Sequence, residues 1–342
     1  MIDLRSDTLT QPSRAMREAA LDAALGDDMY GEDPTVTALE RRTAELLGHE
    51  AGLFVASGTL SNLLGVFTLA NRGEEVLCDE QAHIVRAESG SHAGLHGITT
   101  RTWSSAGSGI ADTATIEALI SPRGGLLTGT AAVEIENTHN FGGGTIQPYE
   151  NLLAIHNMAK RHHVGLHLDG ARLWNAHVVT GIPLADYGKL FDTVSVCYSK
   201  GLGAPVGSVL VSNQDAIAKA RVQRRSLGAA WRQAGVLAAM ALYALEHNIA
   251  RLADDHIGAA EIARRVRDVN PAVITVPPQS NIVVMQTGSR TATELLDAAK
   301  ARGVALSAVG PTTVRAVANL NVTFEECVTA GKVLAELFAT LG

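Results

Sequence analysis

The feature that most constrains the fold is an alternation of strand-like and helix-like segments between residues 51 and 212. Short apolar runs rich in β-branched residues predict strands, and longer segments with apolar residues three or four positions apart predict helices. The predicted strands are AGLFVA, EEVLCDE, AAVEIEN, VGLHLD, DTVSVCYS and a returning strand in GAPVGSVLVSN. The predicted helices are TLSNLLGVFTLANRG, TATIEALI and YENLLAIHNMAKRHH. This alternation predicts an α/β fold, with a mostly parallel sheet covered by helices on both faces.

The flanking segments predict a large domain and a smaller one. Asp33 as a cap, Pro34 at the first helical position and Gly48 at the end define an early helix. After the returning strand the chain reads as helical to about residue 265, including AAWRQAGVLAAMALYALEH. The remainder, with strand-like AVITV and NIVVMQT and helix-like TATELLDAAKARG and FEECVTAGKVLAELFATL, reads as a smaller α/β unit. We expect an arm at residues 1–15, a large domain at 16–245 and a small domain at 246–342.

Composition excludes several classes of partner. The chain has 342 residues, a net charge of −7 and no long basic block, so we expect neither nucleic acid nor membrane as its main partner. The three cysteines (Cys78, Cys197 and Cys327) are far apart and show no metal-ligand spacing, so we expect free thiols and no metal. Charged residues near the amino terminus interrupt what would be the apolar core of a signal peptide. These features predict a cytoplasmic protein.

Four candidate groups follow predicted strands, where ligands collect in an open parallel sheet. Ser57-Gly58-Thr59 opens a helix, where free N–H groups can hold a phosphate. His83, Asp169 and Lys200 each end or follow a strand. Each also has an ordinary interpretation: a plain turn, a loop histidine, a helix cap and an edge charge, respectively.

Taken together, these groups describe a site for pyridoxal phosphate. The cofactor needs a phosphate cradle, an acid for its ring nitrogen, an amine for its aldehyde and a flat group for stacking. Asp169 and Lys200 are separated by about one strand-helix-strand step, which would place them on neighbouring strands.

Motifs along the chain resemble those of the threonine aldolases, the aldolase branch of the β-eliminating lyases. The motifs are MIDLRSDT, DDMYGEDPTV, SGTLSN, QAHI, ENTHN, HLDGARLWNA, SKGLGAPVGS and RLADDH. The resemblance implies the aspartate-aminotransferase type of fold, known as fold type I, with a mostly parallel seven-stranded sheet and a smaller C-terminal α/β domain. It also implies pyridoxal phosphate as cofactor and a homotetramer whose active sites are shared between subunits.

The same resemblance assigns roles to several residues. Lys200 would bind the cofactor aldehyde, and Asp169 would pair with the ring nitrogen. Arg172 would lie near the phenolic oxygen or the substrate carboxylate, Arg315 would bind that carboxylate, and Ser6 would help to hold it.

Further roles concern stacking, the phosphate and the neighbouring subunit. His83 is similar to a histidine that stacks on the ring and is proposed to assist proton transfer. Gly58 and Thr59 would hold the phosphate, and Arg232 resembles an arginine supplied to it across a subunit interface. Tyr30 lies in a motif that reaches toward a neighbouring site. For Tyr30 and Arg232, ordinary interface or core packing is an equally good interpretation.

The activity implied is retro-aldol cleavage of a β-hydroxy-α-amino acid, such as L-threonine or L-allo-threonine, to glycine and an aldehyde. An alternative keeps the cofactor but acts at Cα–H, as a β-eliminating lyase or racemase. Some relatives carry a histidine before the ENTHN strand, whereas SPRGGLLTGTAAV has none, which leaves His83 or a water as the base. Alanines and Trp231 in SLGAAWRQ, where many relatives have glycines and methionine, suggest a pocket for a bulkier β-substituent such as phenyl.

Overall fold

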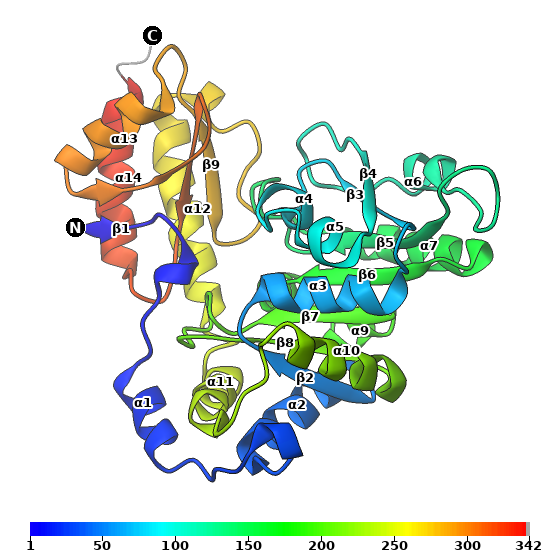
Figure 1. Cartoon of the computed structure of the whole chain (residues 1–342). Coiled ribbons are helices and arrows are strands. Elements are labelled where there is room, and N and C mark those ends of the chain that lie inside the picture. Colours follow the sequence, from blue (N-terminus) through cyan, green and yellow to red (C-terminus); the bar gives the residue numbers. More distant parts are fainter. Residues whose placement is uncertain (340–342) are drawn as a thin grey trace.

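The computed structural model describes residues 1–339 as two lobes, and the carboxyl edge of the central sheet faces the smaller lobe (Figure 1). Within the described residues that sheet has seven strands in the order β2-β8-β7-β6-β5-β3-β4. In this order the strands are β2 (Ala51–Val55), β8 (Ser208–Ser212), β7 (Thr193–Cys197), β6 (Gly165–Gly170), β5 (Thr130–Glu136), β3 (Glu75–Asp79) and β4 (Thr99–Trp103). β8 runs antiparallel to both of its neighbours, and the other pairs are parallel. The predicted mostly parallel sheet is confirmed.

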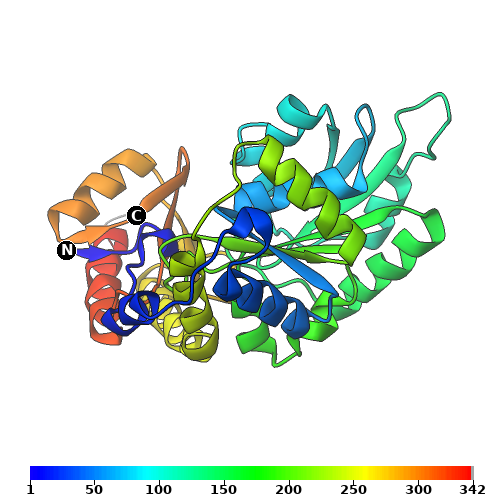
Figure 2. The same ribbon diagram turned by 60° about the horizontal axis from the view of Figure 1, so that its bottom comes forward.

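Helices cover both faces of this sheet, as predicted (Figure 2). One face carries α3 (Gly58–Leu69), α5 (Ser91–His96) and α10 (Gln214–Ser226). The other carries α2 (Pro34–Leu47), α6 (Thr113–Leu119), α7 (Tyr149–His162), α8 (Leu173–Thr180) and α9 (Leu184–Gly188). The Asp33 carboxylate accepts hydrogen bonds from the Thr35 and Val36 amides, and Gly48 ends α2 in the left-handed conformation, as its sequence indicated.

Residues on the central strands alternate between the two faces, and this alternation creates a polar strip beneath α3. Apolar residues of β5, β6 and β7 pack into the large core on the α2 and α7 side. The intervening positions turn toward α3, because side chains alternate along a strand. They are polar and buried: Glu134, Glu136, His167, Asp169 and Ser195. A buried polar strip in the middle of a sheet indicates a functional site, since it costs stability that apolar residues would supply.

The smaller lobe has its own core and sheet. Its strands are β9 (Ile282–Gln286), β10 (Val304–Ala305), β11 (Ser307–Gly310) and β12 (Thr313–Val317), with helices α12 (Leu252–Val269), α13 (Ala292–Ala301) and α14 (Phe324–Ala339). β1 (Ile2–Asp3) pairs with β10, and Leu4 is buried in this core. The amino-terminal arm therefore belongs by packing to the smaller lobe, while the domain boundaries predicted from sequence remain a prediction.

The remaining elements link the lobes. The arm continues through η1 (Asp7–Leu9), α1 (Arg14–Leu21) and η2 (Asp28–Tyr30), and α1 packs on α11 (Gly235–His247). The three cysteines are free and buried, as expected. Among residues 1–339, no helix combines the length and the apolar character that a membrane crossing requires.

Two sequence interpretations are wrong in detail. AVITV is not a strand: η3 (Pro271–Val273) occupies its start, and the flanking Pro271, Pro277 and Pro278 have no N–H group with which to extend a strand ladder on either side. The long helical segment is interrupted at residues 227–234 and 248–251. The last positions of the predicted terminal helix, 340 and 341, lie outside the described residues.

Candidate active site

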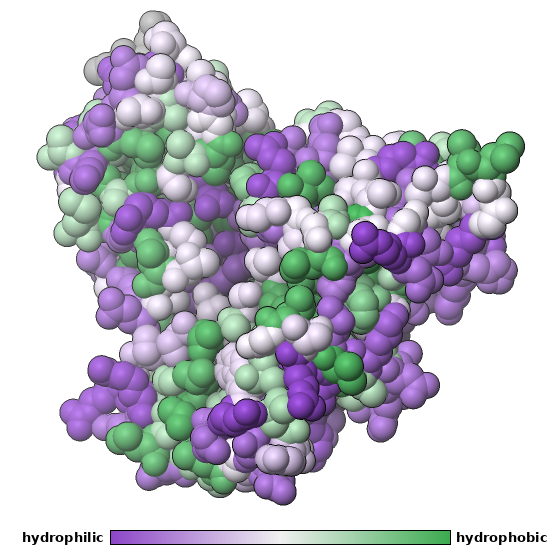
Figure 3. All heavy atoms as spheres, viewed as in Figure 1, coloured by the Kyte–Doolittle hydropathy of each residue, from purple (hydrophilic) through white to green (hydrophobic). Residues whose placement is uncertain are grey.

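The carboxyl edge of the central sheet brings together most of the predicted site residues. Ser57 follows β2, His83 follows β3 and begins α4 (His83–Arg86), Asp169 lies near the end of β6, and Lys200 follows β7. Because β6 pairs directly with β7, Asp169 lies on the strand next to the one that leads to Lys200, although Lys200 itself follows the end of β7 and does not lie on it. In Figure 3 hydrophilic residues gather in the notch between the lobes.

The start of α3 has the form of an anion cradle. The Ser57 hydroxyl caps the helix by accepting from the Leu60 amide at 3.2 Å, while the first-turn amides of Gly58 and Thr59 have no acceptor within the helix. A Cβ at Gly58 would lie 2.8 Å from Cys197 Sγ, so only glycine allows the helix start to approach β7 this closely. The cradle therefore lies beside the strand that leads to Lys200.

Asp169 is a buried, ionised carboxylate held by two donors. Asn62 Nδ2 donates to Oδ2 at 2.7 Å, and the Ala171 amide donates to Oδ1 at 3.0 Å. Burial alone would raise its pKa, but the charges of His83 and Lys200 and the amide hydrogen bond lower it below the ordinary value. Asp169 does not cap α8, which begins after Arg172 without a side-chain cap. A negative charge held this deep suits a cationic partner.

The loop that carries Lys200 is fixed from the arm and from α11. Thr10 Oγ1 donates to the Lys200 carbonyl at 2.8 Å, and Asn248 Nδ2 donates to the Leu202 carbonyl at 2.7 Å. Gly203 has a φ of +81°, and a Cβ there would lie 2.5 Å from Leu320. These contacts hold the backbone under the lysine, while its side chain remains partly exposed toward the edge of the sheet.

Two arginines from different lobes meet at Asn140, but they differ in their acidic partners. Arg172 donates through Nε and Nη2 to both oxygens of Asp7, each at 2.7 Å. Asn140 Oδ1 accepts from Arg172 Nη1 at 3.2 Å and from Arg315 Nη1 at 2.7 Å. Arg315 makes no ion pair with any residue between 1 and 339. Burial and the Arg172 charge lower the pKa of Arg315 to about 10.

His83 belongs to a hydrogen-bonded chain that reaches Asp169. His83 Nδ1 lies 2.8 Å from Glu88 Oε1, and Asn62 Nδ2 donates to that same oxygen at 2.8 Å while also donating to Asp169. Burial would lower the pKa of His83, but the Glu88 hydrogen bond and the nearby carboxylates raise it above the ordinary value. The histidine is therefore tied electrostatically to the acid at the base of the site.

Three predicted site residues are not joined to this group within the chain. The Ser6 hydroxyl caps η1 and contacts Thr8. Tyr30 is 80% exposed, and the Arg232 side chain is 64% exposed. Tyr30 and Arg232 lie near each other, since the Asp28 amide donates to the Arg232 carbonyl. In the described part of the chain, no hydrogen bond or ion pair links either of them to Asp169 or Lys200.

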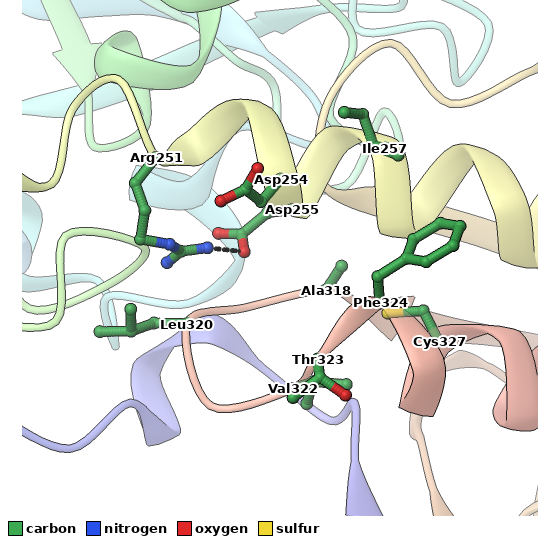
Figure 4. Close-up of a pocket in the computed structure, with 10 residues that line it drawn as sticks. All are labelled: Arg251, Asp254, Asp255, Ile257, Ala318, Leu320, Val322, Thr323, Phe324 and Cys327. Atoms are coloured by element: carbon green, nitrogen blue, oxygen red, sulfur yellow. Dashed lines mark hydrogen bonds and ion pairs between the residues drawn. The ribbon is translucent and has the colours of Figure 1, made fainter.

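None of the predicted site residues lines a separate cavity of about 450 Å³ (Figure 4). It is bounded by the start of α12 and the start of α14, and the Arg251–Asp255 pair of the RLADDH motif lines it. Asp255 Oδ2 lies 3.8 Å from the point where a Cβ at Gly201 would be placed. The motif thus packs against the Lys200 loop.

Sequence reasoning missed four residues that hold the site together: Asp7, Asn62, Glu88 and Asn140. Asp7, Asn62 and Asn140 lie within the motifs MIDLRSDT, SGTLSN and ENTHN, so the motifs contained the signal although no role was assigned to these residues. Glu88 lies outside every motif, and only the geometry identifies it.

Fold and site together define the class. Within residues 1–339, the strand order and the one antiparallel strand of the central sheet are those of the aspartate-aminotransferase type of fold, fold type I, as predicted. The solved threonine aldolase of Leishmania major superposes with a TM-score of 0.83 at 22% identity, covering 99% of this chain and 100% of that one.

Sequence comparison then gives the family. The model of the family described as beta-eliminating lyase matches residues 3–288, and the chain belongs to this family. The low specificity L-threonine aldolase of Escherichia coli K12 is 40% identical over 95% of this chain and 96% of its own length. An uncharacterized Caenorhabditis elegans protein is 44% identical over 79% of this chain, which spans 65% of that protein. The family predicted from the motifs, and with it a lyase, is confirmed.

Proposed function

We propose that the chain binds pyridoxal phosphate and cleaves β-hydroxy-α-amino acids to glycine and an aldehyde. The observation that carries the proposal is the ionised, buried Asp169 on the strand next to the one that leads to Lys200, with the start of α3 beside both. The residues fit the cofactor: the first-turn amides of Gly58 and Thr59 suit a phosphate, and Asp169 suits a protonated ring nitrogen. Lys200 supplies the amine.

The two arginines support an amino acid as substrate. Arg172 is neutralised by Asp7, whereas the Arg315 guanidinium carries a positive charge without an acidic partner in residues 1–339. An uncompensated, partly buried guanidinium is a receptor for a carboxylate. Arg315 binds the substrate carboxylate, Asn140 fixes the direction of the guanidinium, and the bound cofactor supplies an electron-accepting ring for the bond that breaks.

The test measures glycine and aldehyde release from L-threonine, L-allo-threonine and phenylserine, with and without borohydride, which reduces a covalent lysine adduct of the cofactor. We expect borohydride to abolish release, and Lys200→Ala to lower kcat by roughly 10²- to 10⁴-fold, because the variant lacks the amine that would bind the cofactor aldehyde. The exposed Lys219→Ala is the matched control.

Other outcomes would redirect the assignment. A Lys200→Ala protein that cleaves threonine at the normal rate contradicts the proposal. A yellow protein that releases pyruvate and ammonia from serine, and no glycine from any of the three substrates, identifies the β-eliminating alternative.

Three further features belong to the same proposal. The protein is cytoplasmic, and it assembles as a homotetramer in which Tyr30 and Arg232 serve a neighbouring site; their exposure in the single chain supports this assignment. Trp231 packs edge-on against Phe54, with the ring centroids 4.9 Å apart. It favours substrates with a bulky β-substituent, such as phenylserine. Equal ratios of kcat/KM for phenylserine over threonine in the wild type and in Trp231→Met would contradict that preference.

A further inference from the structure

The residues around His83 constrain which of its ring nitrogens is available. The His83 side chain is 27% exposed, whereas Glu88, to which Nδ1 is bonded, has a side chain only 1% exposed. No described residue hydrogen-bonds to Nε2. Burial and the Asp169 charge raise the pKa of Glu88, whereas the hydrogen bonds from His83 and Asn62 favour its carboxylate form. An ionised carboxylate can only accept, so Nδ1 carries the hydrogen while Glu88 is ionised, and Nε2 keeps its lone pair on a side chain that is partly open to solvent.

Asn62 fixes the carboxylate that fixes the histidine. Its Nδ2 donates to both Glu88 and Asp169, and its Oδ1 lies 3.1 Å from His167 Nε2. His167 is fully buried and hydrogen-bonded through Nδ1 to Thr193 Oγ1 at 2.8 Å, and burial lowers its pKa to about 4. The neutral ring donates from Nε2 to Asn62 Oδ1, which leaves the amide hydrogens of Asn62 for the two carboxylates.

This arrangement singles out one histidine at the edge of the sheet. His139 and His167 lie at the same edge or beneath it, but they are 1% and 0% exposed and cannot reach a substrate. The stretch before β5, where some relatives carry a histidine, has none. Of these three histidines, only His83 presents a ring nitrogen to the open side.

We propose that Glu88, held by Asn62, is a positioning residue that fixes the tautomer and basicity of His83, so that His83 Nε2 takes the proton of the substrate β-hydroxyl. The inference rests on the proposed function and deepens it. The O–H bond breaks as N–H forms on Nε2, the oxygen electrons complete the aldehyde C=O, and the Cα–Cβ bond breaks with its electron pair left on the Cα side. The same proton returns from Nε2 to Cα, so the glycine product balances the substrate.

The primary test uses Glu88→Gln, which keeps the shape but removes the charge. A neutral amide no longer stabilises the imidazolium, so the midpoint for protonation of His83 moves to lower pH. We expect kcat at pH 8 to fall about tenfold with KM changed by less than about twofold, and the acidic limb of the rate profile to move to lower pH. Glu88→Asp keeps a carboxylate on a shorter side chain, so we expect it to retain more of the wild-type rate than Glu88→Gln. If Glu88→Gln does not fold, Glu88→Asp is compared with the wild type instead.

A second readout needs no turnover. Diethyl pyrocarbonate modifies neutral imidazole, so its rate at His83 in cofactor-free protein, followed by peptide mass spectrometry across pH, reports the protonation midpoint directly. The midpoint should be lower in Glu88→Gln and unchanged in Glu75→Gln, a buried carboxylate that pairs instead with Arg101 and Thr130. If the wild type releases no glycine, the proposed function is contradicted, but the modification rate still shows whether Glu88 controls the protonation of His83.

The two readouts separate the possible results. A lower modification midpoint together with a displaced rate profile supports the inference. An unchanged midpoint in both Glu88 variants overturns it, as does a lower midpoint with an unchanged rate profile, because the proton acceptor would then lie elsewhere.

Discussion

At the scale of single residues, the two arginines of the site differ in their acidic partners. Arg172 and Arg315 both donate to the side-chain Oδ1 of Asn140, but among residues 1–339 only Arg172 has a carboxylate partner. Arg172 therefore joins the arm to the sheet, and the unpaired charge of Arg315 supports the proposal that Arg315 binds the substrate carboxylate. The motif resemblance left Arg172 with two possible roles, near the phenolic oxygen or at the substrate carboxylate, and these contacts support Arg315 as the carboxylate-binding residue of the proposal.

We expect Arg315→Gln to raise KM for threonine and lower kcat/KM by about 10- to 100-fold, since a charge-assisted hydrogen bond contributes roughly 1.5–3 kcal/mol. Steady-state kinetics at saturating cofactor measure the change. Arg302→Gln, an arginine paired with Glu336 on the surface of the smaller lobe, serves as the control and should leave kcat/KM unaltered. An Arg315→Gln enzyme with the wild-type KM would assign carboxylate binding to another group.

At the scale of elements, the amino-terminal arm fastens the two lobes around the site. β1 pairs with β10 of the smaller lobe, while Asp7 at the start of η1 binds Arg172 and accepts from Asn281 Nδ2 at 3.2 Å. Burial would raise the pKa of Asp7, but the charge and hydrogen bonds of Arg172 outweigh burial and lower the pKa to about 2. The Asp7–Arg172 ion pair therefore holds the arm to the larger lobe.

A carboxyl group whose pKa is lower in the folded than in the unfolded chain stabilises the fold at pH values above the pKa of the unfolded chain. This stabilisation is lost as the pH falls through the pKa of the folded chain. For Asp7, this stabilisation is lost as the pH falls from 4 toward 2. The free energy of unfolding therefore decreases by about 1 kcal/mol between pH 5 and pH 3. We expect Asp7→Asn to remove this dependence and to destabilise the protein by roughly 3–5 kcal/mol at pH 7, because Arg172 is left buried and unpaired.

Urea unfolding of the cofactor-free protein at pH 7, 5, 4 and 3 measures both effects. The exposed Asp215→Asn is the control and should follow the wild-type pH dependence. If Asp7→Asn retains the wild-type pH dependence of the free energy of unfolding between pH 5 and 3, the Asp7–Arg172 ion pair is not the source of that dependence.

Elements with strong periodicity were predictable from sequence, and those set by long-range packing were not. β5, β6 and β7 were recognised because they are apolar, β-branched and bounded by turns, and their spacing placed Asp169 beside Lys200. β4 was missed because its sequence, TTRTW, is polar and lies at the edge of the sheet. Glu88 was missed because its importance depends on Asn62 and His83, which come from different elements.

At the scale of the whole molecule, the exposed Tyr30 and Arg232 allow a test of the proposal that a second chain completes each site. Tyr30 is exposed, the Asp28 amide two residues before it donates to the Arg232 carbonyl, and the loop between α6 and β5 exposes Leu126 and Leu127. Large apolar side chains that are this exposed suit contacts between subunits. A shared site predicts that two differently defective chains can complement each other.

The complementation test combines Lys200→Ala chains with Tyr30→Ala chains, refolded separately and together. If Tyr30 serves the neighbouring site, a mixed pair holds one intact site, with Lys200 from one chain and Tyr30 from the other. Random pairing within a symmetric assembly then restores about a quarter of the wild-type activity, although each variant alone is impaired. Lys200→Ala mixed with Lys219→Ala is the control for chain exchange. Co-refolding that restores nothing beyond the sum of the separate variants would place Tyr30 in its own chain's site, and a fully active Tyr30→Ala would remove it from the site altogether.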